Sequence, residues 1–133
     1  MDEVLEFLKK VGTYYLGTIE DDMPRIRPFG TIHKYDGRLY IQTGRKKDVS
    51  KQIATNPKVE LCAWDGPVWL RVDATLVDDD NLEAEKSLLA EYPMLAGMYA
   101  AGDGNNQVLY LTNATATFYI LGEYPGVDKV ITF

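Results

Sequence analysis

The residues with the clearest chemical potential are cations that gather in the first half of the chain. They are Arg25, Arg27, Lys34, Arg38, Arg45, Lys46, Lys47, Lys51 and Lys58. Acidic residues dominate between Asp73 and Glu91, and the net charge of the 133-residue chain is −6. A negative net charge argues against nucleic acid as the general partner. A local group of cations on an acidic protein predicts instead a site for a small anion such as a phosphate.

Two of these cations stand in a segment that alternates charged and apolar residues, as a half-buried strand does. Arg25 and Arg27 are two residues apart, so their side chains point to the same side of the predicted strand 25–35. Pro28 has no backbone N–H and therefore predicts a sheet edge or a bulge, where the backbone is free for another partner. Exposed strand residues without a ligand are the alternative for both arginines.

A hairpin follows this strand. Asp36-Gly37 is a strong two-residue turn signal between the strands 25–35 and 38–43. The hairpin is expected to bring the two arginines beside the end of the second strand, at Gln42 and Thr43.

The next element is a predicted helix, 46–55, which opens after a turn at Gly44. Free amide donors and the positive end of the helix dipole bind anions at such a start. Lys47 and Lys51 are four residues apart and share one helical face, where they repel each other unless an anion compensates them. The alternative is an ordinary solvated lysine face.

No other residue type predicts a catalytic group. The single cysteine, Cys62, excludes a disulfide framework, fits a reduced cytoplasmic setting, and is expected to be a small core residue rather than a nucleophile. The single histidine, His33, is expected to be exposed and structural. Metal-ligand spacing is absent, which predicts no metal site. The acidic first residues predict neither a signal peptide nor a membrane span.

The length allows one domain, residues 1–133, of mainly β class. Periodicity predicts helices at 2–10, 46–55 and 82–91, with a short helical stretch from Pro93. Strands are predicted at 13–19, 25–35, 38–43, 58–64, 68–77, 108–112 and 114–121. This pattern of six or so antiparallel strands predicts a small barrel with appended helices.

Taken together, four motifs resemble those of the pyridoxamine 5′-phosphate oxidase-like, FMN-binding split-barrel proteins. They are Arg-x-Arg-Pro-Phe-Gly from Arg25, the Asp-Gly hairpin, Thr-Gly-x-x-Lys-x-x-x-Lys-Gln-Ile from Thr43, and Asn-Pro-x-Val-Glu from Asn56. The similarity runs from about Val4 to Leu121. It implies a six-stranded antiparallel split β-barrel and a homodimer with FMN in two clefts between the subunits.

The resemblance also implies which residues contact the flavin. The ribityl chain and ring edge would lie along Arg25, Ile26, Arg27 and Pro28. The ring or the ribityl hydroxyls would bond to Gln42 and Thr43. The phosphate would be held by Lys46, Lys47 and Lys51.

The chain departs from the vitamin B6 enzymes of this family in two respects. Lys47-Asp48-Val49 stands where they typically carry a Ser-x-Lys element, and their C-terminal arginine segment is missing. True pyridoxamine phosphate oxidase activity is therefore not expected. The resemblance implies an FMN-dependent oxidoreductase of a small molecule, with a nicotinamide or similar donor. The alternatives are a flavin-binding electron carrier or sensor without turnover, and a haem-related or cofactor-free split-barrel protein.

Overall fold

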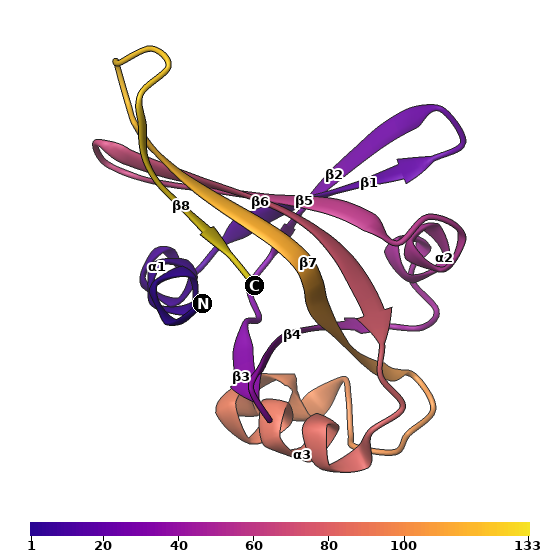
Figure 1. Cartoon of the computed structure of the whole chain (residues 1–133). Coiled ribbons are helices and arrows are strands. Elements are labelled where there is room, and N and C mark those ends of the chain that lie inside the picture. The colour runs from indigo at the N-terminus through magenta and orange to yellow at the C-terminus, as the bar shows by residue number, and fades with distance from the viewer.

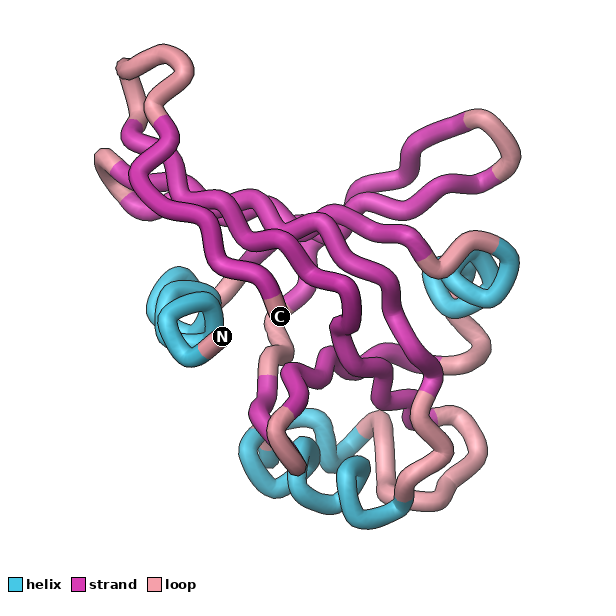
Figure 2. Tube along the Cα trace, viewed as in Figure 1, coloured by secondary structure: helices cyan, strands magenta, loops and turns pink.

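The computed structural model describes all residues, Met1–Phe133, and consists of one strongly twisted antiparallel sheet with α-helices packed against both of its faces (Figures 1 and 2). The strands are β1 Tyr14–Glu20, β2 Met23–Phe29, β3 His33–Tyr35, β4 Arg38–Gly44, β5 Lys58–Asp65, β6 Val68–Asp78, β7 Asn106–Ile120 and β8 Val127–Thr132. The helices are α1 Asp2–Val11, α2 Asp48–Thr55, α3 Leu82–Glu91 and the 3₁₀ helix η1 Pro93–Gly97.

The strands follow the order β2-β1-β5-β6-β7-β4-β3, and β8 also pairs with β7. Every strand pair is antiparallel. The predicted mainly β, antiparallel class is confirmed, but the sheet has eight strands rather than six. None of the helices is both long and apolar enough to cross a lipid bilayer.

The main core lies on the side of the sheet that α1 and α2 cover. Strand residues alternate between buried and exposed, as the pleat requires, so that Leu16, Leu61 and Val72 align across β1, β5 and β6 with no exposed surface. Helix α1 closes this layer with its buried residues Val4 and Leu8. On the opposite face, α3 packs over β4 and β7 through Ala84 and Leu88, whereas β1, β5 and β6 carry no helix there (Figure 1).

The predicted strand 25–35 is in fact two strands, β2 and β3, separated at residues 30–32. Strand β2 pairs with β1 through a tight turn at Asp21, whose φ of 56° is left-handed, and not with β4 as expected. Because the turn is short, β1 is the nearest strand with which β2 can pair. Strand β2 is an edge strand, which confirms the expectation from Pro28.

Two differences concern the C-terminal part. The predicted strands 108–112 and 114–121 form one long strand, β7, with Asn113 at a φ of 49° inside it. Strand β8 was not predicted, because its residues are almost all exposed and no apolar side recurs with a period of two.

His33 is buried, with 9% of its surface exposed, so the expectation of an exposed histidine was wrong. Its Nε2 lies 2.8 Å from Oγ of Ser87 in α3. The helix α3 packs against β3 and covers the ring, which a pattern along β3 alone does not reveal.

This burial predicts a pH dependence of stability. Burial lowers the pKa of His33 below its ordinary value of 6.5, Glu91 opposes the shift and Lys9 adds to it. The folded chain therefore binds this proton less readily than the unfolded chain. The contribution of the neutral His33 ring to the free energy of unfolding should be complete above about pH 6.5. This contribution should fall as the pH drops toward the lower pKa of the folded state.

Urea denaturation at about pH 7.5 and about pH 5.5 measures this change. In His33→Gln, which keeps a hydrogen-bonding side chain that does not titrate, the difference between the two pH values should shrink. An equal difference in both proteins would exclude His33 as its source.

Candidate functional site

A cavity of about 500 Å³ lies between β2 and the start of α2. We call it the cationic cavity. It is lined by Glu20, Arg25, Ile26, Arg27, Lys47, Asp48, Val49 and Gln52. Three cations from two separate elements therefore surround one space.

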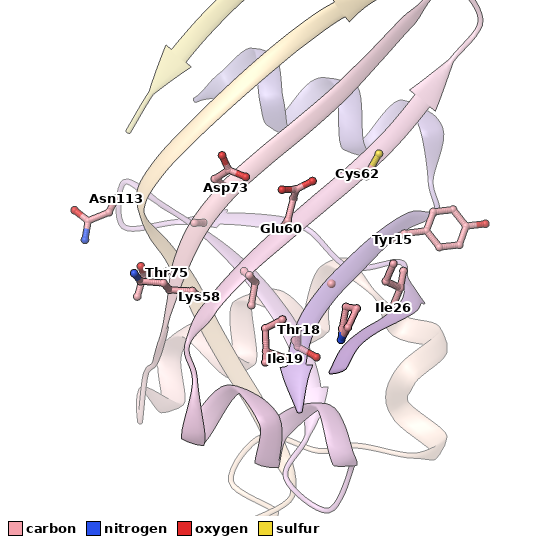
Figure 3. A pocket seen from close by; sticks show the side chains of 14 residues that line it. Tyr15, Thr18, Ile19, Ile26, Lys58, Glu60, Cys62, Asp73, Thr75 and Asn113 are labelled. Carbon is pink, nitrogen blue, oxygen red and sulfur yellow. The ribbon is translucent and has the colours of Figure 1, made fainter. Parts of the chain in front are cut away.

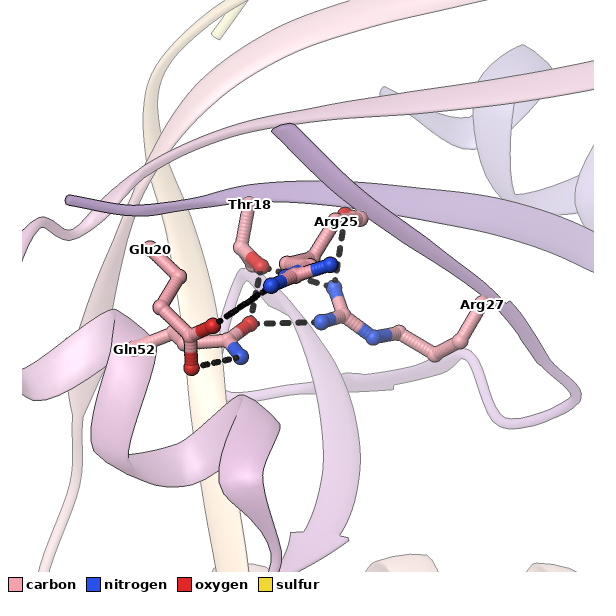
Figure 4. Close-up of polar contacts among 5 residues, drawn as sticks. All are labelled: Thr18, Glu20, Arg25, Arg27 and Gln52. Carbon is pink, nitrogen blue, oxygen red and sulfur yellow. Dashed lines mark hydrogen bonds and ion pairs between the residues drawn. The ribbon is translucent and has the colours of Figure 1, made fainter. Parts of the chain in front are cut away.

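A hydrogen-bond network holds Arg27 in this cavity (Figure 4). The Gln52 Oε1 accepts from Arg27 Nη2 and from Thr18 Oγ1, both at 2.6 Å. Arg27 Nη1 donates to Thr18 Oγ1 at 2.8 Å. The Gln52 Nε2 donates to Glu20 Oε2 at 3.2 Å. The network joins β1, β2 and α2, so the position of Arg27 is fixed by three elements.

The acceptors around Arg27 carry no net charge. They are the Leu16 and Arg25 carbonyls, the Thr18 hydroxyl and the Gln52 carboxamide. Burial lowers the pKa of Arg27, because water is partly removed from the guanidinium. A half-buried cation that forms no ion pair with a carboxylate favours the binding of an external anion.

Arg25 has a different environment from Arg27. Its Nε and Nη2 donate to Glu20 Oε1 at 3.1 and 2.9 Å. These bonds, together with the bond from Gln52, hold the pKa of Glu20 below its usual range. The charge of Arg25 is thus balanced within the chain, whereas Lys47, like Arg27, forms no ion pair.

The helix α2 adds to the positive potential of the cavity. Lys47 is its N-cap residue, and no side chain caps the helix. Asp48 and Val49, in the first turn, line the cavity, so the positive end of the helix dipole faces it. The Asp48 carboxylate also lies in this turn and offsets part of that potential.

A second cavity, of about 390 Å³, adjoins the first at Lys47, which lines both. We call it the tyrosine–methionine cavity. Its first wall consists of Pro28, Phe29, Gly30, Thr31, Gln42 and Thr43 from the strands and the connection between β2 and β3. Its second wall, which we call the η1 wall, consists of Tyr92, Met94, Leu95, Met98 and Tyr99.

The Gln42 side chain supplies a free acceptor in this cavity. Gln42 has 6% of its surface exposed. Its Nε2 donates to the Thr43 carbonyl at 3.2 Å and to Asn106 Oδ1 at 2.9 Å. These two acceptors fix the orientation of the amide, and its Oε1 has no hydrogen-bond partner within the chain. A ligand that donates a hydrogen bond would pair with this oxygen.

A third cavity, of about 590 Å³, lies on the helix-free face of β1, β5 and β6 (Figure 3). We call it the sheet-face cavity. Exposed apolar residues border it, among them Tyr15, 52% exposed, and Ile26, 71% exposed. Cys62 also lines it and is half-buried, so it is not a core residue as expected. Burial raises the pKa of its thiol, which disfavours the nucleophilic thiolate.

Charged residues in this third cavity face one another across strands β5 and β6. Glu60 and Asp73 are directly opposite in the sheet register. Burial, reinforced by Asp73, raises the pKa of Glu60, and Arg71, whose Nε lies 2.8 Å from the carboxylate, opposes the rise. No group of three or more His, Cys, Asp or Glu residues is arranged to hold a metal ion.

The structure brings most of the predicted site residues to the first two cavities. Arg25, Ile26, Arg27 and Lys47 line the cationic cavity, and Pro28, Gln42, Thr43 and Lys47 line the tyrosine–methionine cavity. Lys46 and Lys51 are exposed and line neither. Strands β2 and β4 do not pair, but Thr31, in the connection after β2, links the two segments. Its Oγ1 accepts a hydrogen bond from the Gln42 backbone N–H at 3.0 Å.

Three features of the site were missed from the sequence. Thr18 and Gln52 fix Arg27, and the η1 wall closes the second cavity. Gln52 stands within the Lys-Gln-Ile motif, which was the available signal. The η1 wall follows no apolar period, and only its exposed methionines and tyrosines, close together after Pro93, mark it in the sequence.

Comparisons with known proteins agree with the fold described above. The family model described as pyridoxamine 5′-phosphate oxidase matches residues 1–119. A NimC/NimA family protein from Clostridium acetobutylicum is 36% identical, with a TM-score of 0.93 over 100% of this chain and 93% of that one. None of the curated proteins matches the chain.

More distant structures share the fold. A pyridoxamine 5′-phosphate oxidase-related, FMN-binding protein from Nostoc punctiforme is 15% identical, with a TM-score of 0.66 over 93% of this chain and 84% of that one. General stress protein 26 from Bacillus anthracis is also 15% identical, with a TM-score of 0.70 over 98% and 99% of the two chains.

Proposed function

Because the chain belongs to the pyridoxamine 5′-phosphate oxidase family, we propose that it binds FMN and acts as an oxidoreductase on a small molecule. The phosphate lies in the cationic cavity, against Arg27, Lys47 and the start of α2. The ring system extends past Lys47 into the tyrosine–methionine cavity, along Pro28, Gln42 and Thr43. Arg25 and Ile26 border the phosphate end, and the exposed Lys46 and Lys51 contribute long-range charge.

The observation that carries this proposal is the uncompensated charge of Arg27 beside Lys47. A phosphate supplies the anionic acceptors that the neutral neighbours of Arg27 do not. At the other end, the free Oε1 of Gln42 fits a hydrogen-bond donor such as a ring N–H or a ribityl hydroxyl. The residues present therefore match both ends of FMN.

When bound, FMN supplies the transfer of electrons, and the chain supplies position and charge. Arg27 and Lys47 anchor one end, and Gln42 and Thr43 orient the other. A nicotinamide is the electron donor that we propose. Bleaching of the protein's flavin absorbance by NAD(P)H separates such an enzyme from an electron carrier or sensor without turnover.

We further propose that a second copy of the chain covers the sheet-face cavity and forms a homodimer. The cavity is bordered by exposed apolar residues on the face of β1, β5 and β6 that carries no helix. Such patches mark interaction surfaces. Ile26 lines both this cavity and the cationic cavity, so a partner on this face borders the phosphate site as well.

The charges of this face are compatible with self-association. Lys58, Glu60 and Asp73 line it, and Arg71 pairs with Glu60. Two positive and two negative groups balance in each copy. A two-fold interface places the same surface on both sides, so a strong net charge there would oppose the dimer.

Substitution of Lys47, the N-cap residue of α2, and of Lys51, within α2, tests the phosphate site. Lys47→Ala is expected to weaken FMN binding about tenfold, because one charge-assisted hydrogen bond is lost at an exposed position. Lys51→Ala is the matched control on the same helix, and its effect should be below about threefold, because Lys51 lines neither cavity. Fluorescence titration of flavin-free protein with FMN gives both dissociation constants.

Equal effects of the two substitutions would place the phosphate along the outer face of α2. An unchanged affinity in Lys47→Ala, or a wild-type protein that does not bind FMN, would reject the assignment of the cationic cavity.

A further inference from the structure

We propose that the η1 wall binds the substrate, and that this substrate is an uncharged planar molecule. The inference rests on the proposed FMN site, because it assigns the first wall of the tyrosine–methionine cavity to the flavin. It adds the chemical class of the second ligand and the residues that select it, Tyr92, Met94, Leu95, Met98 and Tyr99.

The lining of the cavity excludes a charged substrate on chemical grounds. It contains no carboxylate, and its one cation is Lys47, which also lines the cationic cavity and serves the phosphate. The remaining polar groups are neutral hydroxyls and the Gln42 carboxamide. An anion or a cation on the η1 wall would lose part of its hydration without gaining an ionic partner.

The composition and exposure of the η1 wall favour a ligand rather than a structural role. The helix η1 has no buried residue. Met94 is 71% exposed and Met98 is 68% exposed, although both are large apolar side chains. Methionine is flexible and polarizable and makes favourable contacts with aromatic rings. Two exposed methionines beside two tyrosines form a surface suited to a flat ring.

Both ends of the η1 wall are fixed to the strands. The Tyr92 hydroxyl donates to the Ile32 carbonyl at 2.9 Å and accepts from the Ile32 amide at 2.9 Å. Tyr99 packs directly on Gly44, where an added Cβ would lie 2.8 Å from its Oη. The position of the η1 wall relative to the strands is therefore set by the fold rather than by a ligand.

The two walls of the cavity thus suit two different ligands. The first wall offers the Gln42 acceptor and backbone, which suit the polar edge of the flavin. The η1 wall offers thioethers and phenol rings, which suit the face of a second ring. A planar acceptor or donor that stacks on the flavin would contact both the flavin and the η1 wall.

Methyl NMR of the methionines tests this assignment. The chain has four methionines, Met1, Met23, Met94 and Met98, and only the last two line the cavity. We expect 2-methyl-1,4-naphthoquinone, an uncharged bicyclic probe, to shift the ¹³C-methyl signals of Met94 and Met98 in FMN-loaded protein and to leave Met23 unchanged. The double variant Met94→Ala/Met98→Ala should bind the probe about tenfold more weakly, with Met23→Ala as control.

Each other outcome contradicts the inference. The first is a shift on FMN addition without a further shift on quinone addition, which means that the η1 wall covers the flavin. The second is tighter binding of 1,4-naphthoquinone-2-sulfonate than of the neutral quinone, which means that the site selects anions. The third is a double variant that loses FMN affinity as strongly as quinone affinity.

A failure of the proposed FMN site is distinguished by the same spectra. FMN addition to flavin-free protein would then leave every methyl signal and the absorbance of free FMN unchanged. Absence of a quinone shift in protein whose bound FMN is established contradicts only the inference about the η1 wall.

Discussion

Arg27→Gln is expected to weaken FMN binding about 10- to 100-fold, which is the largest effect of any single substitution in the cationic cavity. Hydrogen bonds to charged groups contribute about 1.5–3 kcal/mol each, and the change removes the one guanidinium of this cavity that lacks an anionic partner. Arg25→Gln should have a smaller effect, because Glu20 already balances its charge. Fluorescence titration with FMN gives the dissociation constants.

The network around Arg27 requires a stability control for this experiment. The substitution also removes bonds to Thr18 and Gln52, so part of the lost affinity could arise from a loosened β1–β2–α2 junction. Thermal denaturation of each flavin-free protein separates the two effects. Arg38→Gln is the matched arginine control, since Arg38 lies over the Tyr110 ring and lines none of the three cavities. An Arg27→Gln protein with wild-type affinity would remove the main support for the phosphate site.

Ile26→Glu is expected to raise the dissociation constant of the homodimer about 100-fold or more. Ile26 is 71% exposed in the single chain and lines the sheet-face cavity, which the partner covers in the proposed dimer. Burial of an unpaired carboxylate costs about 3–5 kcal/mol, and two-fold symmetry introduces it twice. Sedimentation velocity at a series of concentrations measures the change, and the flavin content should fall with the dimer fraction.

A matched substitution guards this experiment against a general effect of charge. Leu82 is another exposed apolar residue, at the start of α3 and outside the sheet-face cavity, and Leu82→Glu should leave the dimer intact. A wild-type chain that is monomeric at micromolar concentration would contradict the proposed homodimer. An Ile26→Glu protein that remains dimeric would move the interface to another face.

The sequence was most informative where a local signal determines the structure. The helices 2–10 and 82–91 and the Asp36-Gly37 hairpin agree with the structure within a residue or two. Each depends on a cap, a turn residue or a period that the chain carries by itself. The antiparallel β class followed from the same short-range signals.

The pairing of the arginine strand could not be predicted in this way. The segment 25–35 alternates throughout, and nothing in its pattern marks the break at residues 30–32. Partner choice depended on the Asp21 turn, which brings β2 back along β1 at once. The site residues nevertheless lie close together, because Thr31, which follows β2, accepts a hydrogen bond from Gln42 in β4.

The environment of each cation could not be predicted from the sequence either. Arg25 and Arg27 share one side of β2, yet one binds Glu20 and the other binds only neutral acceptors. The difference comes from Gln52, which arrives from α2 and separates Arg27 from the carboxylate (Figure 4). Contacts between distant segments decide such charges, and periodicity carries no information on them.

The prolines of β2 have a consequence for solubility. Successive residues of a strand direct their N–H groups to opposite sides, so Pro24, Ile26 and Pro28 share one side of the edge strand β2. Only Ile26 can donate a hydrogen bond there. A border with a single donor is a poor template for the addition of a foreign strand, which is how open sheets begin to polymerise. The molecule can therefore keep this border accessible to small molecules with little risk of fibril growth.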